Sequence, residues 1–213
     1  MTKRNVQSLA SQEPTLPSRF RQNREFKRSD RRVRKTVLSV RPLARVVAGV
    51  PRGILQVGQR SLPCAIGRSG IGVKRREGDG VTPIGRFSAL GWLKRAEKWT
   101  ANPPGCHKIR PSDGWCDDPR SFHYNRPVQL PIGASAENLW REDGIYDLIG
   151  VLDYNLKPRV MGRGSAIFFH LAHRDLRPTA GCIAIKPDDM RRLAPILAKR
   201  LIFRVGLDAR PQR

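Results

Sequence analysis

Two stretches of the sequence, residues 164–170 (GSAIFFH) and 178–185 (PTAGCIAI), carry most of the information about the fold. The first is an apolar run that ends on a histidine, and the second is a tight turn that leads into another apolar run. Gly181 would permit a backbone bend that a side chain would block. The pattern therefore predicts two strands, with His170 at the end of one and Cys182 at the start of the other.

His170 and Cys182 are the side chains of this pattern that can carry chemistry. A thiolate is the reactive form of cysteine, and an imidazole placed beside the thiol can take its proton. The backbone N–H groups of Ala180, Gly181 and Cys182 could form an oxyanion hole around a tetrahedral intermediate. Alternatively, Cys182 is a small buried hydrophobic residue and His170 is a satisfied core residue. The spacing alone leaves both interpretations open.

The surrounding sequence consists of short apolar runs separated by glycine and proline, which predicts a mainly β domain, a sandwich or barrel. The expected strands are residues 36–40, 44–48, 53–57, 62–66, 86–93, 145–153, 165–171, 182–185 and 201–205. One late helix is expected over residues 187–199, since Pro187 stands at its start and acidic residues follow. Pro195 should kink or split this helix. Residues 98–131, with their proline, glycine and aspartate, are expected to form a long loop.

The chain of 213 residues holds 41 Lys and Arg against 18 Asp and Glu, a formal net charge of +23. This charge suggests a polyanionic partner, and nucleic acid, an anionic membrane surface and an anionic cell-wall polymer all fit. No helix-turn-helix or aromatic nucleic-acid signature accompanies the charge, so nucleic acid is the less favoured partner. No apolar stretch is long enough for a transmembrane helix, and no signal peptide is visible. Residues 1–35 are expected to be a disordered basic tail, and residues 36–213 the folded domain.

The remaining cysteines have simpler interpretations. Cys64 lies within an apolar run and is expected in the core. Cys106, His107, Cys116 and His123 have the residue types of a zinc site, but their spacing matches no zinc knuckle, so ordinary packing or exposure is favoured. A disulfide between Cys106 and Cys116 is the alternative for an exported protein. No metal ion or cofactor is expected.

Other motifs are weaker. Residues 74–80 (KRREGDG) contain glycine and lysine but lack the spacing of a phosphate-binding loop followed by a helix, so a charged loop is expected. The tryptophans do not share a strand period, and are expected in the core or in pocket walls rather than in a base-stacking row. They are Trp92, Trp99, Trp115 and Trp140.

Residues 36–205 resemble an L,D-transpeptidase catalytic domain of the YkuD family. Residues 179–183 (TAGCI) are similar to the Ser/Thr-x-Gly-Cys-aliphatic motif around that family's nucleophile, with His170 as the upstream histidine. Residues 80–87 (GVTPIGRF) are similar to the Thr-Pro-x-Gly-x-aromatic turn that precedes a strand in the family. The order and separation of the two motifs also fit.

Two departures from the common pattern place the resemblance with a short-loop subgroup. Ala180 stands where the common motif has a second histidine, and the interval between His170 and Cys182 is shorter. His173, in the loop three residues after His170, is the second candidate for the base. A strand end holds a ring more firmly than a loop does, which favours His170.

The resemblance implies a YkuD-type mixed β-sandwich or barrel and a cysteine acyltransferase that needs no cofactor. In that family the cysteine attacks a diamino acid carbonyl in a peptidoglycan stem tetrapeptide, D-alanine leaves, and an amine of another stem resolves the thioester as a 3→3 cross-link. Cys182 would be the nucleophile and His170 the general base and acid. The alternatives are an L,D-carboxypeptidase on the same substrate, or a non-catalytic protein that binds cell wall or nucleic acid.

The resemblance also implies where substrate and inhibitors would bind. A donor that carries carboxylates needs a basic partner, for which Arg163 is the expected residue, with Thr179 and His173 as further contacts. Peptidoglycan stem peptides are the expected partners, and carbapenem-type β-lactams the expected inhibitors. The family's chemistry belongs to the periplasm or cell envelope.

Overall fold

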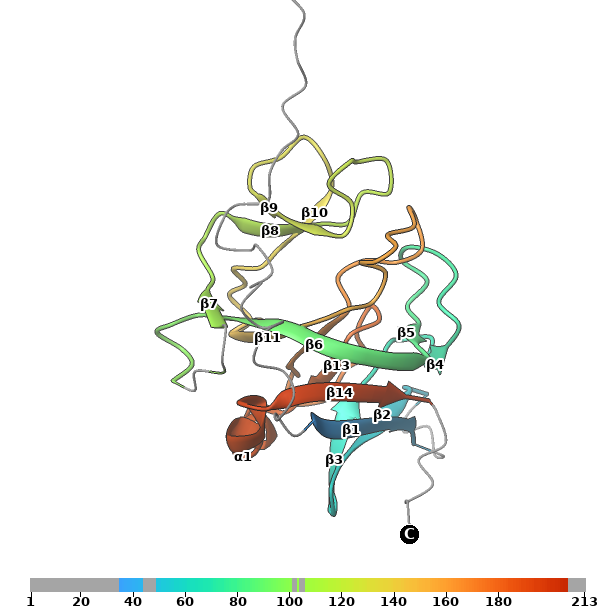
Figure 1. Ribbon diagram of the computed structural model, residues 1–213, viewed down its shortest axis with the longest axis vertical. Helices are drawn as coiled ribbons and strands as arrows, with labels where there is room; N and C mark the ends of the chain where they lie inside the picture. Colours follow the sequence, from blue (N-terminus) through green and yellow to red (C-terminus); the bar gives the residue numbers. More distant parts are fainter. Residues whose placement is uncertain (1–34, 44–48, 101–102, 104–105, 207–213) are drawn as a thin grey trace, which may run out of the picture.

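The computed structural model describes residues 35–43, 49–100, 103 and 106–206. Over these residues the main sheet has nine strands in the order β11-β12-β13-β3-β2-β1-β14-β6-β7 (Figure 1). The sheet closes on itself, because β11 pairs with both β12 and β6. The prediction of a mainly β, barrel-like domain with one late helix is therefore confirmed. The strands are β1 (Lys35–Pro42), β2 (Arg52–Val57), β3 (Arg60–Ala65), β6 (Gly85–Lys94), β7 (Cys106–Lys108), β11 (Leu148–Leu152), β12 (Phe168–Leu171), β13 (Ile183–Ile185) and β14 (Arg200–Val205).

Eight of the nine expected strands fall on strands of this sheet, and the ninth, residues 44–48, lies outside the described residues. The expected tail likewise lies outside them, except that β1 begins at Lys35. Strand β12 begins at Phe168, later than expected, because Ala166 has a φ of 51°. This left-handed conformation is incompatible with a strand and bends the chain just before the histidine.

The expectation of one long loop over residues 98–131 is wrong. Strand β7 joins the main sheet beside β6, and a second sheet of three strands in the order β10-β8-β9 lies beyond the barrel (Figure 1). Strands this short offer too few positions for an alternating pattern, so pairing and burial decide their conformation. The elements are β8 (Asp113–Cys116), β9 (Arg126–Gln129) and β10 (Ala136–Asn138). A two-stranded sheet pairs β4 (Ile71–Gly72) with β5 (Thr82–Pro83).

Helix α1 (Pro187–Leu197) is continuous, so Pro195 does not split it, and it ends two residues before the end expected from the sequence. Pro195 is exposed and stands near the end of the helix. Because proline has no N–H group, the carbonyl of Arg191, four residues earlier, lacks its helical hydrogen bond, but it lies on the exposed face of the helix. The opposite face buries Met190, Leu193 and Leu197. Within the described part of the chain, no helix is long and apolar enough to cross a membrane.

The predictions for single core residues are confirmed. Cys64 is fully buried in the main hydrophobic cluster. Trp92 and Trp99 belong to the same cluster, and Trp115 to a second one against which Trp140 packs. None of the four takes part in an exposed aromatic row.

Candidate active site

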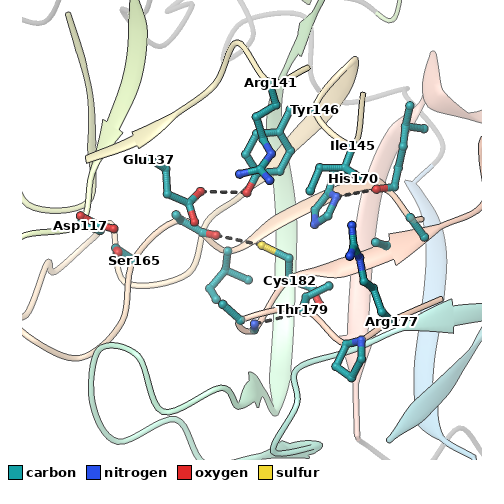
Figure 2. Close-up of a pocket in the computed structure, with 18 of the residues that line it drawn as sticks. Asp117, Glu137, Arg141, Ile145, Tyr146, Ser165, His170, Arg177, Thr179 and Cys182 are labelled. Carbon is teal, nitrogen blue, oxygen red and sulfur yellow. Dashed lines mark hydrogen bonds between the residues drawn. The ribbon is translucent and has the colours of Figure 1, made fainter. Parts of the chain in front are cut away.

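The parallel strands β12 and β13 bring the two candidate catalytic residues into one cavity of about 430 Å³ (Figure 2). His170 lies within β12, and Cys182 directly precedes β13. The placement expected from the sequence, a histidine near the end of one strand and a cysteine at the start of the next, is thus found. Both side chains are buried.

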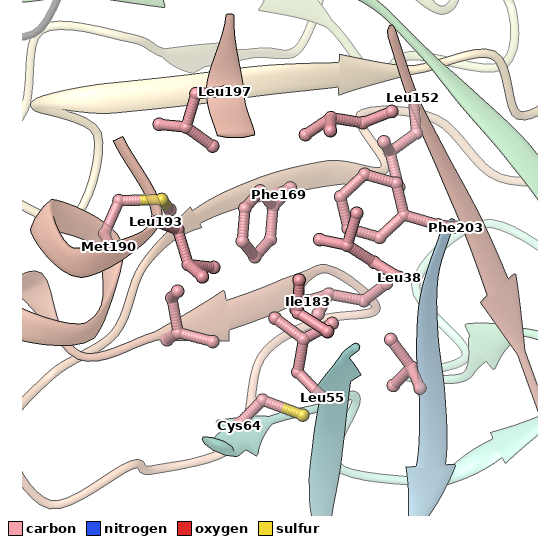
Figure 3. Close-up of a cluster of buried hydrophobic side chains, with 14 of the residues drawn as sticks. Leu38, Leu55, Cys64, Leu152, Phe169, Ile183, Met190, Leu193, Leu197 and Phe203 are labelled. Carbon is pink, nitrogen blue, oxygen red and sulfur yellow. The ribbon is translucent and has the colours of Figure 1, made fainter. Parts of the chain in front are cut away.

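Alternation along β12 aims His170 at the cavity. Phe169 packs in the main core against Phe203 and near Ile183 of β13 (Figure 3). Because successive side chains of a strand point to opposite faces, Phe168 and His170 lie on the other face. There Phe168 packs in the second cluster together with Cys182. The apolar core on one face of the sheet therefore positions the candidate pair, His170 and Cys182, on the other.

The Cys182 thiol is engaged by the backbone before β12. Its Sγ accepts a hydrogen bond from the Phe168 N–H at 3.3 Å and donates to the Ala166 carbonyl at 3.1 Å. Figure 2 shows the sulfur directed away from the His170 ring. Burial raises the pKa of the thiol to about 12, and the Glu137 carboxylate adds to this rise, while the Phe168 N–H and the charge of Lys74 oppose it. Cys182 is therefore a neutral thiol in this arrangement.

The His170 ring is held by a carbonyl and an aromatic edge. Nδ1 lies 2.8 Å from the Leu171 carbonyl oxygen, and because a carbonyl only accepts, this nitrogen carries the hydrogen. Nε2 is then the nitrogen free to take a proton. The Tyr146 ring meets the imidazole edge-on at 5.1 Å between centroids. Burial lowers the pKa of His170 to about 4, and the Leu171 and Ile145 carbonyls oppose the fall.

Thr179 shapes the turn before Cys182. Its Oγ1 donates to the Cys182 carbonyl at 2.7 Å and accepts the Gly181 N–H at 3.1 Å. Its backbone bonds to Ile66 and Arg68 tie the turn to the end of β3. Of the three amides expected in an oxyanion hole, that of Gly181 is thus already bonded to Thr179.

The two sequence motifs meet at this turn. Thr82 accepts the Gly67 N–H at 2.7 Å, and its hydroxyl lies 3.5 Å from the Cys182 carbonyl. Gly181 has a φ of 148°, and a Cβ atom there would lie 2.9 Å from the Val81 carbonyl oxygen. The Thr-Pro turn therefore packs directly behind the cysteine turn, which leaves no room for a side chain at Gly181.

Arg141, His173 and Arg177 form a basic edge of the cavity. Arg141 pairs with Asp143 at 2.7 Å, and His173 lies 3.8 Å from the same carboxylate. The Arg177 guanidinium lies 2.7 Å from Nε2 of His173. The expected Arg163, in contrast, is exposed and does not line the cavity. Sequence reasoning missed Arg141 and Arg177, although the second could have been noticed from its place just before the 178–185 motif.

Another wall of the cavity is acidic. Glu137 accepts a hydrogen bond of 2.8 Å from the Tyr146 hydroxyl, and burial raises the pKa of its carboxyl group. Glu77 accepts hydrogen bonds from the hydroxyls of Tyr124 and Ser165. Asp117 lines the same wall. The cavity that holds the sulfur and the imidazole is thus lined by both carboxylates and guanidinium groups, with Arg141 close to Glu137 and Arg177 beside His173.

The residues weighed for zinc do not form a site. No group of three His, Cys, Asp or Glu side chains converges among the described residues. The four cysteines, Cys106 and Cys116 included, are free, so the alternative of a disulfide between those two is not realised.

Comparison with known proteins gives two matches. An L,D-transpeptidase from Mycobacterium smegmatis shares 14% sequence identity, with a TM-score of 0.34. The alignment covers 80% of this chain and 57% of that protein, so this chain spans little more than half of that protein's length. No curated protein matches the sequence. Among protein families, YkuD, the L,D-transpeptidase catalytic domain, matches residues 52–205.

The family match covers most of the chain and includes the Thr-Pro turn, His170 and the cysteine turn, the segments that the fold brings together around the cavity. This chain belongs to the YkuD family of L,D-transpeptidase catalytic domains.

Proposed function

We propose that this protein is a peptidoglycan L,D-transpeptidase that forms 3→3 cross-links through a thioester on Cys182. The observation that carries the proposal is the placement of Cys182 and His170 at neighbouring strand ends in one cavity. Family membership supports the reaction class. The substrate would be a stem tetrapeptide, and the first product D-alanine.

In the first half-reaction, the Cys182 thiol turns from the Ala166 carbonyl toward the substrate. Its sulfur bonds to the diamino acid carbonyl carbon as His170 Nε2 takes the thiol proton. The C–N bond to D-alanine then breaks, and the imidazolium returns the proton to the leaving amine. Because thiol and imidazole are both neutral at rest, the proton moves during attack rather than beforehand.

In the second half-reaction, an amine of another stem attacks the thioester and gives its proton to His170. The S–C bond breaks and the sulfur is protonated again. Water in place of the amine would release a tripeptide, the carboxypeptidase outcome. We assign oxyanion stabilisation to the amides of Ala180 and Cys182, because that of Gly181 is bonded to Thr179.

The cavity is lined by both basic and acidic side chains, which suits a stem peptide that carries carboxylates and an ammonium group. Arg177, Arg141 and His173 at the basic edge would bind its carboxylates. Glu137 on the acidic wall offers a partner for the ammonium group of a diamino acid. This function would place the protein in the cell envelope, and carbapenems would acylate Cys182 as substrate analogues.

The test is incubation with disaccharide-tetrapeptide muropeptides, followed by mass spectrometry. We expect dimers that lack one D-alanine, absent with Cys182→Ala and retained with Cys106→Ala as the matched cysteine control. Tripeptide monomers alone would replace the transferase with the carboxypeptidase. Unchanged substrate, together with no carbapenem adduct on Cys182, would overturn both.

A further inference from the structure

Lys74 is a buried cation beside the candidate nucleophile. It begins the charged segment 74–80 between β4 and β5, yet its side chain is only 2% exposed. The neighbouring Arg75 and Arg76 are exposed. Lys74 instead lines the same cavity as Cys182. A charged side chain is seldom buried without a partner or a function.

Asp79 fixes the ammonium group in place. Lys74 Nζ lies 2.6 Å from Oδ1 of Asp79, and this carboxylate also accepts the backbone N–H groups of Arg75, Arg76 and Val81. Although partial burial acts in the opposite direction, these hydrogen bonds hold the pKa of Asp79 well below its ordinary value. The Asp79 carboxylate is therefore ionised at neutral pH.

Two glycines make the space that the lysine occupies. A Cβ atom on Gly164, which has a φ of 103°, would overlap Cε of Lys74. A Cβ atom on Gly181 would lie 3.5 Å from Nζ. Because Gly181 directly precedes Cys182, the ammonium group lies beside the turn that carries the thiol.

Titratable groups from three parts of the fold line the cavity that holds the thiol. They are Glu137 on the acidic wall, Lys74 in the segment behind the turn, and His170 on β12, and of these Glu137 and Lys74 act on the thiol through their charges. His170 is neutral at rest, since burial lowers its pKa to about 4. The imidazole thus supplies no standing positive charge, and Lys74 is the cation that acts on Cys182.

We propose that Lys74 is an electrostatic positioning residue, whose ammonium group, fixed by Asp79 beside the 181–182 turn, stabilises the Cys182 thiolate. Lys74 transfers no proton, and its charge stabilises the negative charge that develops on the sulfur while His170 takes the thiol proton. The inference rests on the proposed function only in taking Cys182 as the nucleophile.

The experiment measures the alkylation rate of Cys182 by iodoacetamide between pH 6 and 11, with peptide mapping to separate the four cysteines. This range lies below the thiol pKa of about 12, so a change in that pKa appears as a change in rate at every pH. The rate follows the thiolate fraction. Lys74→Gln keeps a donor for Asp79 but removes the charge, and we expect the apparent pKa of the thiol to rise by about one unit, roughly a tenfold slower reaction at pH 8. Lys74→Arg should restore most of the rate. Arg76→Gln, the exposed control on the same segment, should leave it unchanged.

Asp79→Asn should change the apparent pKa of the thiol in the opposite direction to Lys74→Gln. Asparagine keeps an acceptor oxygen but no longer balances the charge of Lys74. We expect the apparent pKa of the thiol to fall. An unchanged thiol titration in folded Lys74→Gln, or an unchanged or raised one in folded Asp79→Asn, would overturn the proposal. Loss of the fold in both variants, seen by circular dichroism, would assign the pair a structural role and overturn it as well. The alkylation needs no peptidoglycan, so failure of the transpeptidase assay would be a separate result.

Discussion

The carbonyl oxygen of Val81 lies 2.9 Å from the position that a Cβ atom on Gly181 would occupy. The Thr-Pro turn and the cysteine turn, 100 residues apart at their Thr82–Cys182 contact, are therefore packed backbone against backbone. This contact sets the direction in which Cys182 enters the cavity.

Gly181→Ala should both destabilise the protein and stop the chemistry. The substitution places a methyl group against the Val81 carbonyl in a left-handed conformation, which costs on the order of 1–3 kcal/mol. The free energy of unfolding in urea and the rate of carbapenem acylation would measure the two effects. Gly133→Ala is the control, since no atom lies near its Cβ position. Equal stability of the two variants would contradict the packing described.

Thr179→Val should slow the acylation of Cys182 clearly, while it lowers the free energy of unfolding only modestly. The hydroxyl holds the Cys182 carbonyl and the Gly181 amide, so its loss frees the turn at a cost of about 1 kcal/mol in folding. Thr179→Ser keeps the hydroxyl and should retain most of the activity. Single-turnover acylation together with thermal melting would check this, and equal activity of the two variants would refute it.

Arg177→Gln should raise the KM for the tetrapeptide roughly tenfold with little change in kcat, since a charged hydrogen bond to a carboxylate contributes about 1.5–3 kcal/mol. Arg163→Gln should change neither parameter, because that side chain is exposed outside the cavity. Steady-state kinetics on muropeptides would separate the two arginines. A raised KM in Arg163→Gln with an unchanged KM in Arg177→Gln would instead indicate that Arg163 binds the substrate.

Glu137→Gln should make the Cys182 thiol more acidic. The carboxylate raises the pKa of the thiol, whereas glutamine removes the charge and keeps an acceptor for the Tyr146 hydroxyl. Alkylation of Cys182 at pH 8 should therefore be faster than in the wild type, opposite in sign to Lys74→Gln. Glu142→Gln, near in sequence and outside the cavity lining, is the control. A slower reaction in Glu137→Gln would count against this electrostatic account.

Stability should fall as the pH is lowered from about 7 toward 4. The pKa of His170 is about 4 in the folded chain and 6.5 ordinarily, so in this window the unfolded chain binds the extra proton. The contribution of His170 is present above its ordinary pKa, and on the order of 3 kcal/mol is lost as the pH falls through the window. Urea unfolding at a series of pH values should show a flatter profile in His170→Asn than in the control His123→Asn. Parallel profiles would mean that His170 does not titrate this way.

The chain could be assigned to a mainly β fold from sequence because its longer strands are local apolar patterns bounded by turn residues. The runs at 53–57, 86–93 and 201–205 became β2, β6 and β14 with small shifts of their ends. The prediction of a long loop over residues 98–131 was wrong because the strands in this stretch, β7, β8 and β9, have only three or four residues each. Strands this short are stabilised by partners distant in the sequence, which a local pattern does not contain.

The local motifs of the sequence were enough to predict the family and the placement of His170 and Cys182 at neighbouring strand ends, because the strands and the turn of these motifs follow from residue type. The tertiary structure alone decided which charges surround that pair. Lys74, Glu137 and Arg177 come from segments far apart in the sequence, and the tertiary fold brings them to one cavity. Electrostatic effects depend on distance and burial rather than on spacing along the chain. For this reason the sequence did not reveal that Lys74 is a buried cation, or that Arg163 is exposed to solvent.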